Sequence, residues 1–173
     1  MACFLSALPV AAQALAPAAP VVSVQSSGAG AEATATIEIH ATRDAVWRVL
    51  TSCAAAVKII PGLRECEVQA TAADRSWQRI RQVVDYSWYL PKISYVVVAT
   101  YDRPNRIDFE QSAGDLAVLR GHWELQSAGG ATVAHYGLRV VPGFWMPGWI
   151  VRLGLERKLP RMLGALRDLA ETR

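Results

Sequence analysis

Between Leu63 and Val141, apolar and polar residues alternate in six successive segments, and only short turns separate them. Alternation with a period of two is typical of strands that bury one face. The turns are too short for the crossover connections of parallel strands, so we expect an antiparallel sheet in which each segment pairs with the next. The predicted strands are Leu63–Ala70, Trp77–Tyr86, Ile93–Tyr101, Arg106–Gln111, Leu116–Gln126 and Ala131–Val141.

A first strand and two short helices precede this run. Residues Thr34–His40 alternate in the same way and predict the strand. Thr42 is a typical N-cap residue, and the apolar residues after it recur with helical spacing. Ala54–Ile60 adds a second short helical segment, which Pro61-Gly62 ends.

The end of the chain predicts one long helix with an apolar stripe. Pro160 lies inside it, so we expect a kink or a break near Leu159. The basic residues fall mostly on the other side, which we interpret as a solvated face, with an anionic-lipid patch as the alternative. A long antiparallel sheet twists and curls, and curled around one helix it encloses space for a ligand. The basic residues are Arg152, Arg157, Lys158, Arg161 and Arg167.

The first 31 residues contain no charged side chain, which separates a leader from the body of the protein. We predict a signal peptide at residues 1–14, because small residues at Ala12 and Ala14 follow an apolar stretch. An Ala-rich disordered tail is the alternative. Residues 15–33 are predicted to be a flexible linker, and residues 34–173 one domain. Export predicts a periplasmic or secreted protein, in which Cys53 and Cys66 form either a disulfide or two buried thiols.

Composition excludes several functions. The 18 Lys and Arg residues against 15 Asp and Glu residues give a net charge of +3 without a basic stripe, so we expect no nucleic-acid partner. Gly28-Ala29-Gly30 neither follows a predicted strand nor opens a predicted helix, which argues against a dinucleotide cofactor. No cofactor of another kind is indicated.

The three histidines are candidate metal ligands. If Ser127–Gly130 is a four-residue turn, His122 and His135 are direct cross-strand neighbours on the face opposite Trp123. A metal site would then need His40 as a third ligand. We predict instead an outward-facing histidine pair without a metal.

Three groups of residues, in this order, carry a family resemblance. They are Ala41–Thr51 with Pro61-Gly62-Leu63; Gly114–Leu116 with Gly121–Leu125, Gly129–Val133 and Tyr136; and Pro142, Pro147 and the terminal helix. Over about residues 33–173 the chain resembles the START-like (SRPBCC, helix-grip) superfamily, in its polyketide cyclase/dehydrase and lipid-transport group near the coenzyme Q-binding branch. Many members carry an Asp after the first helix, where this chain has Ser52-Cys53.

The resemblance implies an α+β helix-grip fold: a curved antiparallel sheet of about seven strands wrapped on a long C-terminal helix, with two short helices after the first strand. It also implies a deep apolar cavity that binds lipids, isoprenoid quinones or polyketides. We therefore expect a carrier of a hydrophobic ligand that catalyses no reaction. The alternative is a polyketide cyclase or dehydratase, an aromatase-type enzyme acting in the same cavity, although no residue pattern indicates a catalytic base.

Aromatic residues are the candidate ligand-binding side chains. For Trp123, which shares a strand face with Leu119 and Leu125, ordinary core packing is an equal alternative. The Phe144–Trp149 loop is interpreted as a lid or plug, and the alternative is transient membrane contact through Phe144, Trp145 and Met146. The predicted ligand-binding residues are Trp123, Phe109, Tyr95 and Tyr136 on the wall of the cavity, with Trp145 and Trp149 at its mouth.

Overall fold

The structure is a computed structural model that describes residues 18–86 and 91–172. Its elements are, in chain order, β1 (Val21–Ser27), β2 (Gly30–Ile39), α1 (Arg43–Leu50), α2 (Cys53–Ile59), β3 (Leu63–Thr71), β4 (Trp77–Val84), β5 (Ile93–Asp102), β6 (Arg106–Gly114), β7 (Leu116–Ala128), β8 (Ala131–Pro142) and α3 (Gly148–Glu171). The six strands predicted after Leu63 all begin at the predicted residue.

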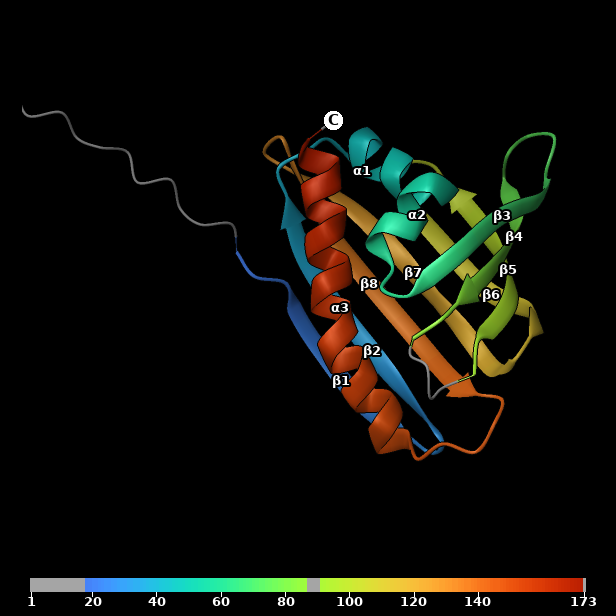
Figure 1. Ribbon diagram of the computed structural model, residues 1–173. Helices are drawn as coiled ribbons and strands as arrows, with labels where there is room; N and C mark the ends of the chain where they lie inside the picture. The colour runs from blue at the N-terminus through green and yellow to red at the C-terminus, as the bar shows by residue number, and fades with distance from the viewer. Residues whose placement is uncertain (1–17, 87–90, 173) are drawn as a thin grey trace, which may run out of the picture.

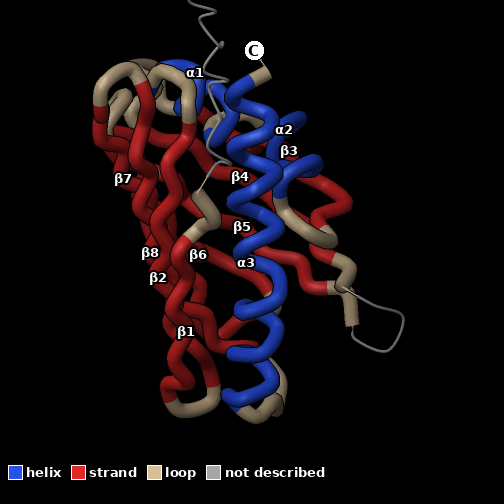
Figure 2. The backbone as a smooth tube through the Cα atoms, turned by 90° about the vertical axis from the view of Figure 1, so that its left-hand side faces the viewer, coloured by secondary structure: helices blue, strands red, loops and turns tan. Residues whose placement is uncertain are grey.

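The strands form one antiparallel sheet in the order β1-β2-β8-β7-β6-β5-β4-β3. From β3 to β8 each strand pairs with the next one in the chain, as predicted. β2 lies beside β8 and pairs with it, although the two strands are far apart in the sequence. The sheet curves around the helices, and α3 lies along its concave side (Figures 1 and 2). The predicted α+β helix-grip architecture is confirmed, with eight strands among the described residues in place of about seven.

The predicted linker is wrong where the structure describes it. Residues 21–27 form β1, which pairs with β2 from Val21↔Thr36 to Ser27↔Gly30, so the domain begins before residue 34. Val22 and Val24 pack against the core. The segment has few large side chains, and its strand depends on pairing with β2 and packing under α3 rather than on its own apolar pattern. The predicted signal peptide at residues 1–14 lies outside the described residues.

Side-chain caps begin both short helices. The Ala45 backbone N–H donates to Thr42 Oγ1 over 3.3 Å, and the Ala55 N–H donates to Ser52 Oγ over 3.3 Å. Each bond satisfies an amide that has no partner within its helix. Asp44 lies in the first turn of α1, where a negative charge favours the helix dipole. The predicted N-cap at Thr42 is confirmed.

A disulfide joins the helices to the sheet. Cys53, the first residue of α2, is bonded to Cys66 on β3, with 5.2 Å between their Cα atoms. Of the two alternatives for this pair, the structure shows the disulfide. It fixes α2 over the part of the concave face that β3 and β4 form.

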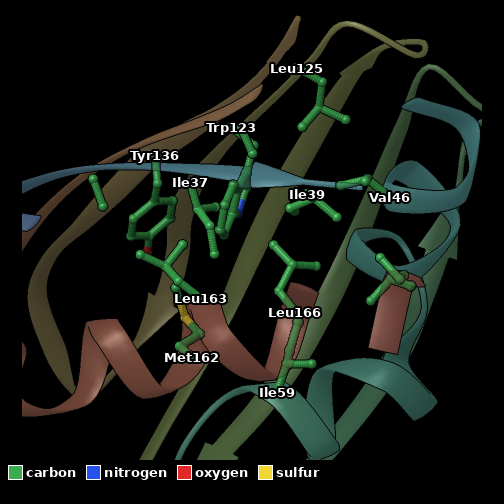
Figure 3. Close-up of a cluster of buried hydrophobic side chains, with 14 of the residues drawn as sticks. Ile37, Ile39, Val46, Ile59, Trp123, Leu125, Tyr136, Met162, Leu163 and Leu166 are labelled. Carbon is green, nitrogen blue, oxygen red and sulfur yellow. The ribbon is translucent and has the colours of Figure 1, made fainter. Parts of the chain in front are cut away.

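The core lies where the C-terminal half of α3 meets β2, β7 and β8 (Figure 3). Leu159, Leu163 and Leu166 are buried there, whereas residues 149–158 of α3 have no buried side chain. The helix runs unbroken through Pro160, so the predicted break does not occur; packing of the buried second half outweighs one lost hydrogen bond. Among the described residues, no helix has the length and apolarity of a membrane span.

Candidate ligand-binding face

Three aromatic side chains lie side by side on the concave face of the sheet. Trp123 on β7 pairs in register with Tyr136 on β8, and their ring centroids are 4.4 Å apart. The ring of Phe109 on β6 stacks on that of Tyr136, with centroids 6.3 Å apart and planes 21° apart. We call these three rings the aromatic row; Figure 3 shows two of them, Trp123 and Tyr136, above α3.

The missing side chain of Gly121 makes this stacking possible. Gly121 pairs with Phe109 across β6 and β7, and on the same strand it precedes Trp123 by two positions. A Cβ at residue 121 would lie 2.6 Å from Phe109 Cζ, closer than real Cβ atoms approach a neighbour. The phenylalanine ring can therefore extend over the glycine to reach Tyr136.

Burial along the concave face is uneven. Trp123 is 8% exposed and Tyr136 is buried, but inward-facing residues on β4, β5 and β6 keep water-accessible surface. Neither the N-terminal half of α3 nor the short helices cover this part of the sheet completely within the described residues. The half-buried inward residues are Ile80, Gln82, Tyr95, Phe109 and Gln111.

Polar groups lie within this incompletely covered part. Gln111 Nε2 donates to the Leu116 carbonyl over 2.7 Å, while its Oε1 is buried without a partner among the described residues. The pKa of the Tyr95 phenol is raised well above its usual range, first by burial and then by the neighbouring phenols of Tyr86 and Tyr136. Burial likewise raises the pKa of Tyr136. These phenols are neutral hydrogen-bonding groups at physiological pH, and they lie near one another.

Lys158 on α3 lies at the edge of this patch. Its Nζ is 3.0 Å from the centroid of the Tyr86 ring, a cation–π contact. Desolvation lowers the pKa of Lys158 to about 8, so its ammonium is still largely protonated at neutral pH. Tyr86 is 41% exposed, and burial raises the pKa of its phenol.

The residues of this face fall within the match to a known family. The sequence profile described as "Polyketide cyclase / dehydrase and lipid transport" matches residues 39–167, most of the chain.

The chain belongs to the polyketide cyclase/dehydrase and lipid transport family.

Solved structures share the fold of this family member. The STAR-related lipid transfer protein from Xanthomonas axonopodis (fragment 25–204) superposes with a TM-score of 0.77 at 17% identity, over 91% of this chain and 96% of that chain. Human STARD10 superposes with a TM-score of 0.74 at 12% identity, over 91% of this chain and 71% of that chain. The Zhui aromatase/cyclase from Streptomyces sp. R1128 superposes with a TM-score of 0.66 at 20% identity, over 82% of this chain and 94% of that chain. Among curated protein sequences, none matches the chain.

The structure separates the six predicted site residues of this family member into two groups. Trp123, Phe109, Tyr95 and Tyr136 all face the concave side. Trp145 and Trp149 lie apart from them at the N-terminal end of α3, where they are 90% and 63% exposed. Trp145 is therefore no plug under the helix, because it has almost no packing partner. Gln111, Tyr86 and Lys158 were not predicted as site residues.

The predicted histidine pairing is wrong in register. The turn after β7 has only two residues, Gly129 and Gly130, whose φ angles of +56° and +93° suit the tight hairpin turns that match strand twist. The register therefore shifts, and His122 faces Gly137 while His135 faces Glu124.

Both histidines do point outward, on the face opposite Trp123, and His135 Nδ1 lies 3.0 Å from Thr36 Oγ1. His40, the third candidate, is exposed, and its backbone N–H donates to Glu171. No group of three potential metal ligands occurs within residues 18–86 and 91–172.

The outer face of the sheet has a depression of about 610 Å³. Arg139 and Glu32 pair across it over 2.9 Å, and Arg120, His122 and Asp108 also line it. Glu110 lines it as well, so charged side chains of both signs are present. Ala33, Val98, Phe109 and Leu138 add apolar atoms to its lining.

Proposed function

We propose that this protein binds and carries a hydrophobic ligand, such as a lipid, an isoprenoid quinone or a polyketide-like molecule, on the concave face between the sheet and α3. The observation that supports this most directly is the aromatic row beside inward-facing side chains that the helices leave partly uncovered. Apolar surface with a few convergent polar groups is the usual composition of small-molecule sites. Membership of a family whose description includes lipid transport agrees with it.

Mass spectrometry of an organic extract tests this proposal. We expect protein purified under native conditions to release a lipid or quinone, and the emptied protein to rebind a quinone, a fatty acid or an aromatic polyketide mimic. Because Trp123 lies in the aromatic row, rebinding should change tryptophan fluorescence. An empty extract together with no fluorescence change for any of the three compounds would contradict the proposal. Conversion of the mimic into a dehydrated aromatic product would instead favour the cyclase alternative.

We further propose that the N-terminal end of α3 contacts anionic membranes during ligand exchange. Trp145 and Trp149 are exposed together with Ile150 and Leu153, which is an unusual concentration of apolar surface for one end of a soluble domain. Arg152, Arg157 and Arg161 follow on the same helix, and of the three only Arg152 has an ion-pair partner on α3, Glu156. Tryptophan beside basic residues is suited to the interface of an anionic bilayer.

The double variant W145A/W149A should partition onto phosphatidylcholine vesicles that contain phosphatidylglycerol roughly tenfold less or weaker still. Each substitution removes apolar area that the membrane interface would bury. Vesicle co-sedimentation measures the effect. V57A removes apolar surface from α2, at the opposite end of the molecule, and serves as the matched control. Equal partitioning of all three proteins would refute membrane contact at this end.

We also propose that the protein is exported. The small residues Ala12 and Ala14, within the uncharged first 31 residues, support this, and so does the disulfide between Cys53 and Cys66, since such bonds persist mainly in oxidising compartments.

A further inference from the structure

The ammonium group of Lys158 has hydrogen-bonding capacity that the described residues do not use. It touches the face of the Tyr86 ring, which satisfies one side of the group. The ion pairs described on α3 join Arg152 to Glu156 and Arg167 to Asp168, and Lys158 takes part in neither. An ammonium carries three N–H donors, and a partly desolvated one is costly unless an acceptor or a counter-charge meets it.

The sheet beneath Lys158 supplies no counter-charge. In the observed register, every described inward position on β2 and on β4 to β8 is apolar or uncharged. The acidic residues of these strands, such as Asp108, Glu110 and Glu124, alternate onto the outer face. The concave face therefore has a cation at its edge and no anion within the described strands.

The concave face also holds polar groups without a hydrogen-bond partner among the described residues. The phenols of Tyr86, Tyr95 and Tyr136 are held neutral, so each keeps an O–H to donate, and no hydrogen bond from these hydroxyls is found among the described residues. Gln111 Oε1 is the one buried acceptor without a partner there. Buried polar groups are almost always paired, which makes such a set a place for a ligand's polar end.

We infer that the ligand is an amphipathic anion, whose carboxylate or phosphate head binds Lys158 Nζ and the neighbouring phenols while its apolar body lies along the aromatic row. This inference rests on the proposed carrier function. A carboxylate or phosphate is rich in acceptors and supplies the missing negative charge. A neutral hydrophobic molecule would fill the apolar surface but would leave the ammonium without a counter-ion.

Matched pairs of ligands test the inference. Palmitate is compared with hexadecanol, and lysophosphatidic acid with monopalmitoylglycerol, so that each pair shares its tail and differs in head charge. Each compound displaces the neutral probe 1-N-phenylnaphthylamine from the delipidated full chain. The two anions distinguish a carboxylate head from a phosphate head.

We expect K158M to weaken binding of at least one anion by roughly tenfold or more, the range for a lost charge-assisted hydrogen bond, and to change binding of the neutral partner by less than about twofold. K58M removes an exposed lysine of α2 by the same substitution and should change neither. Circular dichroism confirms that each variant is folded. Equal loss of anion and neutral binding in K158M, or full anion binding, would overturn the inference.

A second measurement requires no variant. Acetic anhydride labelling of the wild-type protein, read by mass spectrometry, should show Lys158 protected by the anion and not by its neutral partner, with exposed Lys58 labelled equally in both. Equal labelling of Lys158 in both would contradict the inference. If neither anions nor neutral compounds displace the probe, the carrier function itself fails; if neutral compounds bind as tightly as anions, only the charged-head inference fails.

Discussion

Replacing Trp123 by alanine should lower the free energy of unfolding by about 3–5 kcal/mol, the usual cost of truncating a large buried aromatic side chain. Trp123 is 8% exposed, its ring contacts that of Tyr136, and it lies in the cluster that contains Ile37 and Leu163 (Figure 3). The loss combines the lost burial of the indole with the cavity that it leaves. Urea denaturation followed by circular dichroism measures it.

The sequence contains a matched control for this change. W145A removes the same side chain from a position that is 90% exposed, and should change the unfolding free energy by less than about 0.5 kcal/mol. W123F keeps a ring against Tyr136 and separates the two roles considered for this residue. A stable W123F with weakened ligand binding would add a binding role to the packing role. A loss below about 1 kcal/mol in W123A would show that the residue is not part of a close-packed core.

Removing the disulfide should lower the free energy of unfolding by about 3 kcal/mol, because the bond closes a loop of 13 residues and restricts the unfolded chain. The double variant C53S/C66S tests this by denaturation without reductant. The wild-type protein in reductant should show the same loss, whereas reductant should not affect the variant. Identical stability of variant and wild type would contradict the expectation.

The same bond reports on export. Thiol alkylation during lysis of the native host, followed by mass spectrometry, determines whether Cys53 and Cys66 are oxidised in the cell. We expect the disulfide, since an exported protein reaches an oxidising compartment. Two alkylated thiols in a chain that still begins at Met1 would contradict export.

The sheet could be predicted from sequence because its signals are local. Alternation defined each strand after Leu63, and turns such as Gly114-Asp115 left antiparallel pairing as the one arrangement compatible with their length. β1 could not be predicted in this way, because few of its residues are large and its stability depends on β2 and α3. The hairpin register was wrong because the Gly129-Gly130 pair allows a two-residue turn, a signal that was present in the sequence.

The candidate site was less predictable because its polar members depend on where distant elements meet. Phe109 and Tyr136 could be placed on the apolar face from alternation alone. Alternation places Gln111 on the face of Ile107 and Phe109, but a polar residue at the end of a strand gives no sign that its amide is buried in a site. Lys158 was interpreted as part of a solvated helix surface. Its amino group lies against the ring of Tyr86, a residue far from it in the sequence. No local sequence pattern encodes that contact.

Pro160 divides α3 at the boundary between its two environments. It offers no N–H to the carbonyl of Glu156, so the helix lacks one backbone hydrogen bond just where the buried half, which begins at Leu159, meets the half without buried side chains. Fluctuations of the first half can therefore have a small opening free energy of their own, separate from cooperative unfolding of the core. If the proposed ligand binds beneath the first half, such opening would admit and release it while the global stability, set by the second half and the sheet, stays unchanged.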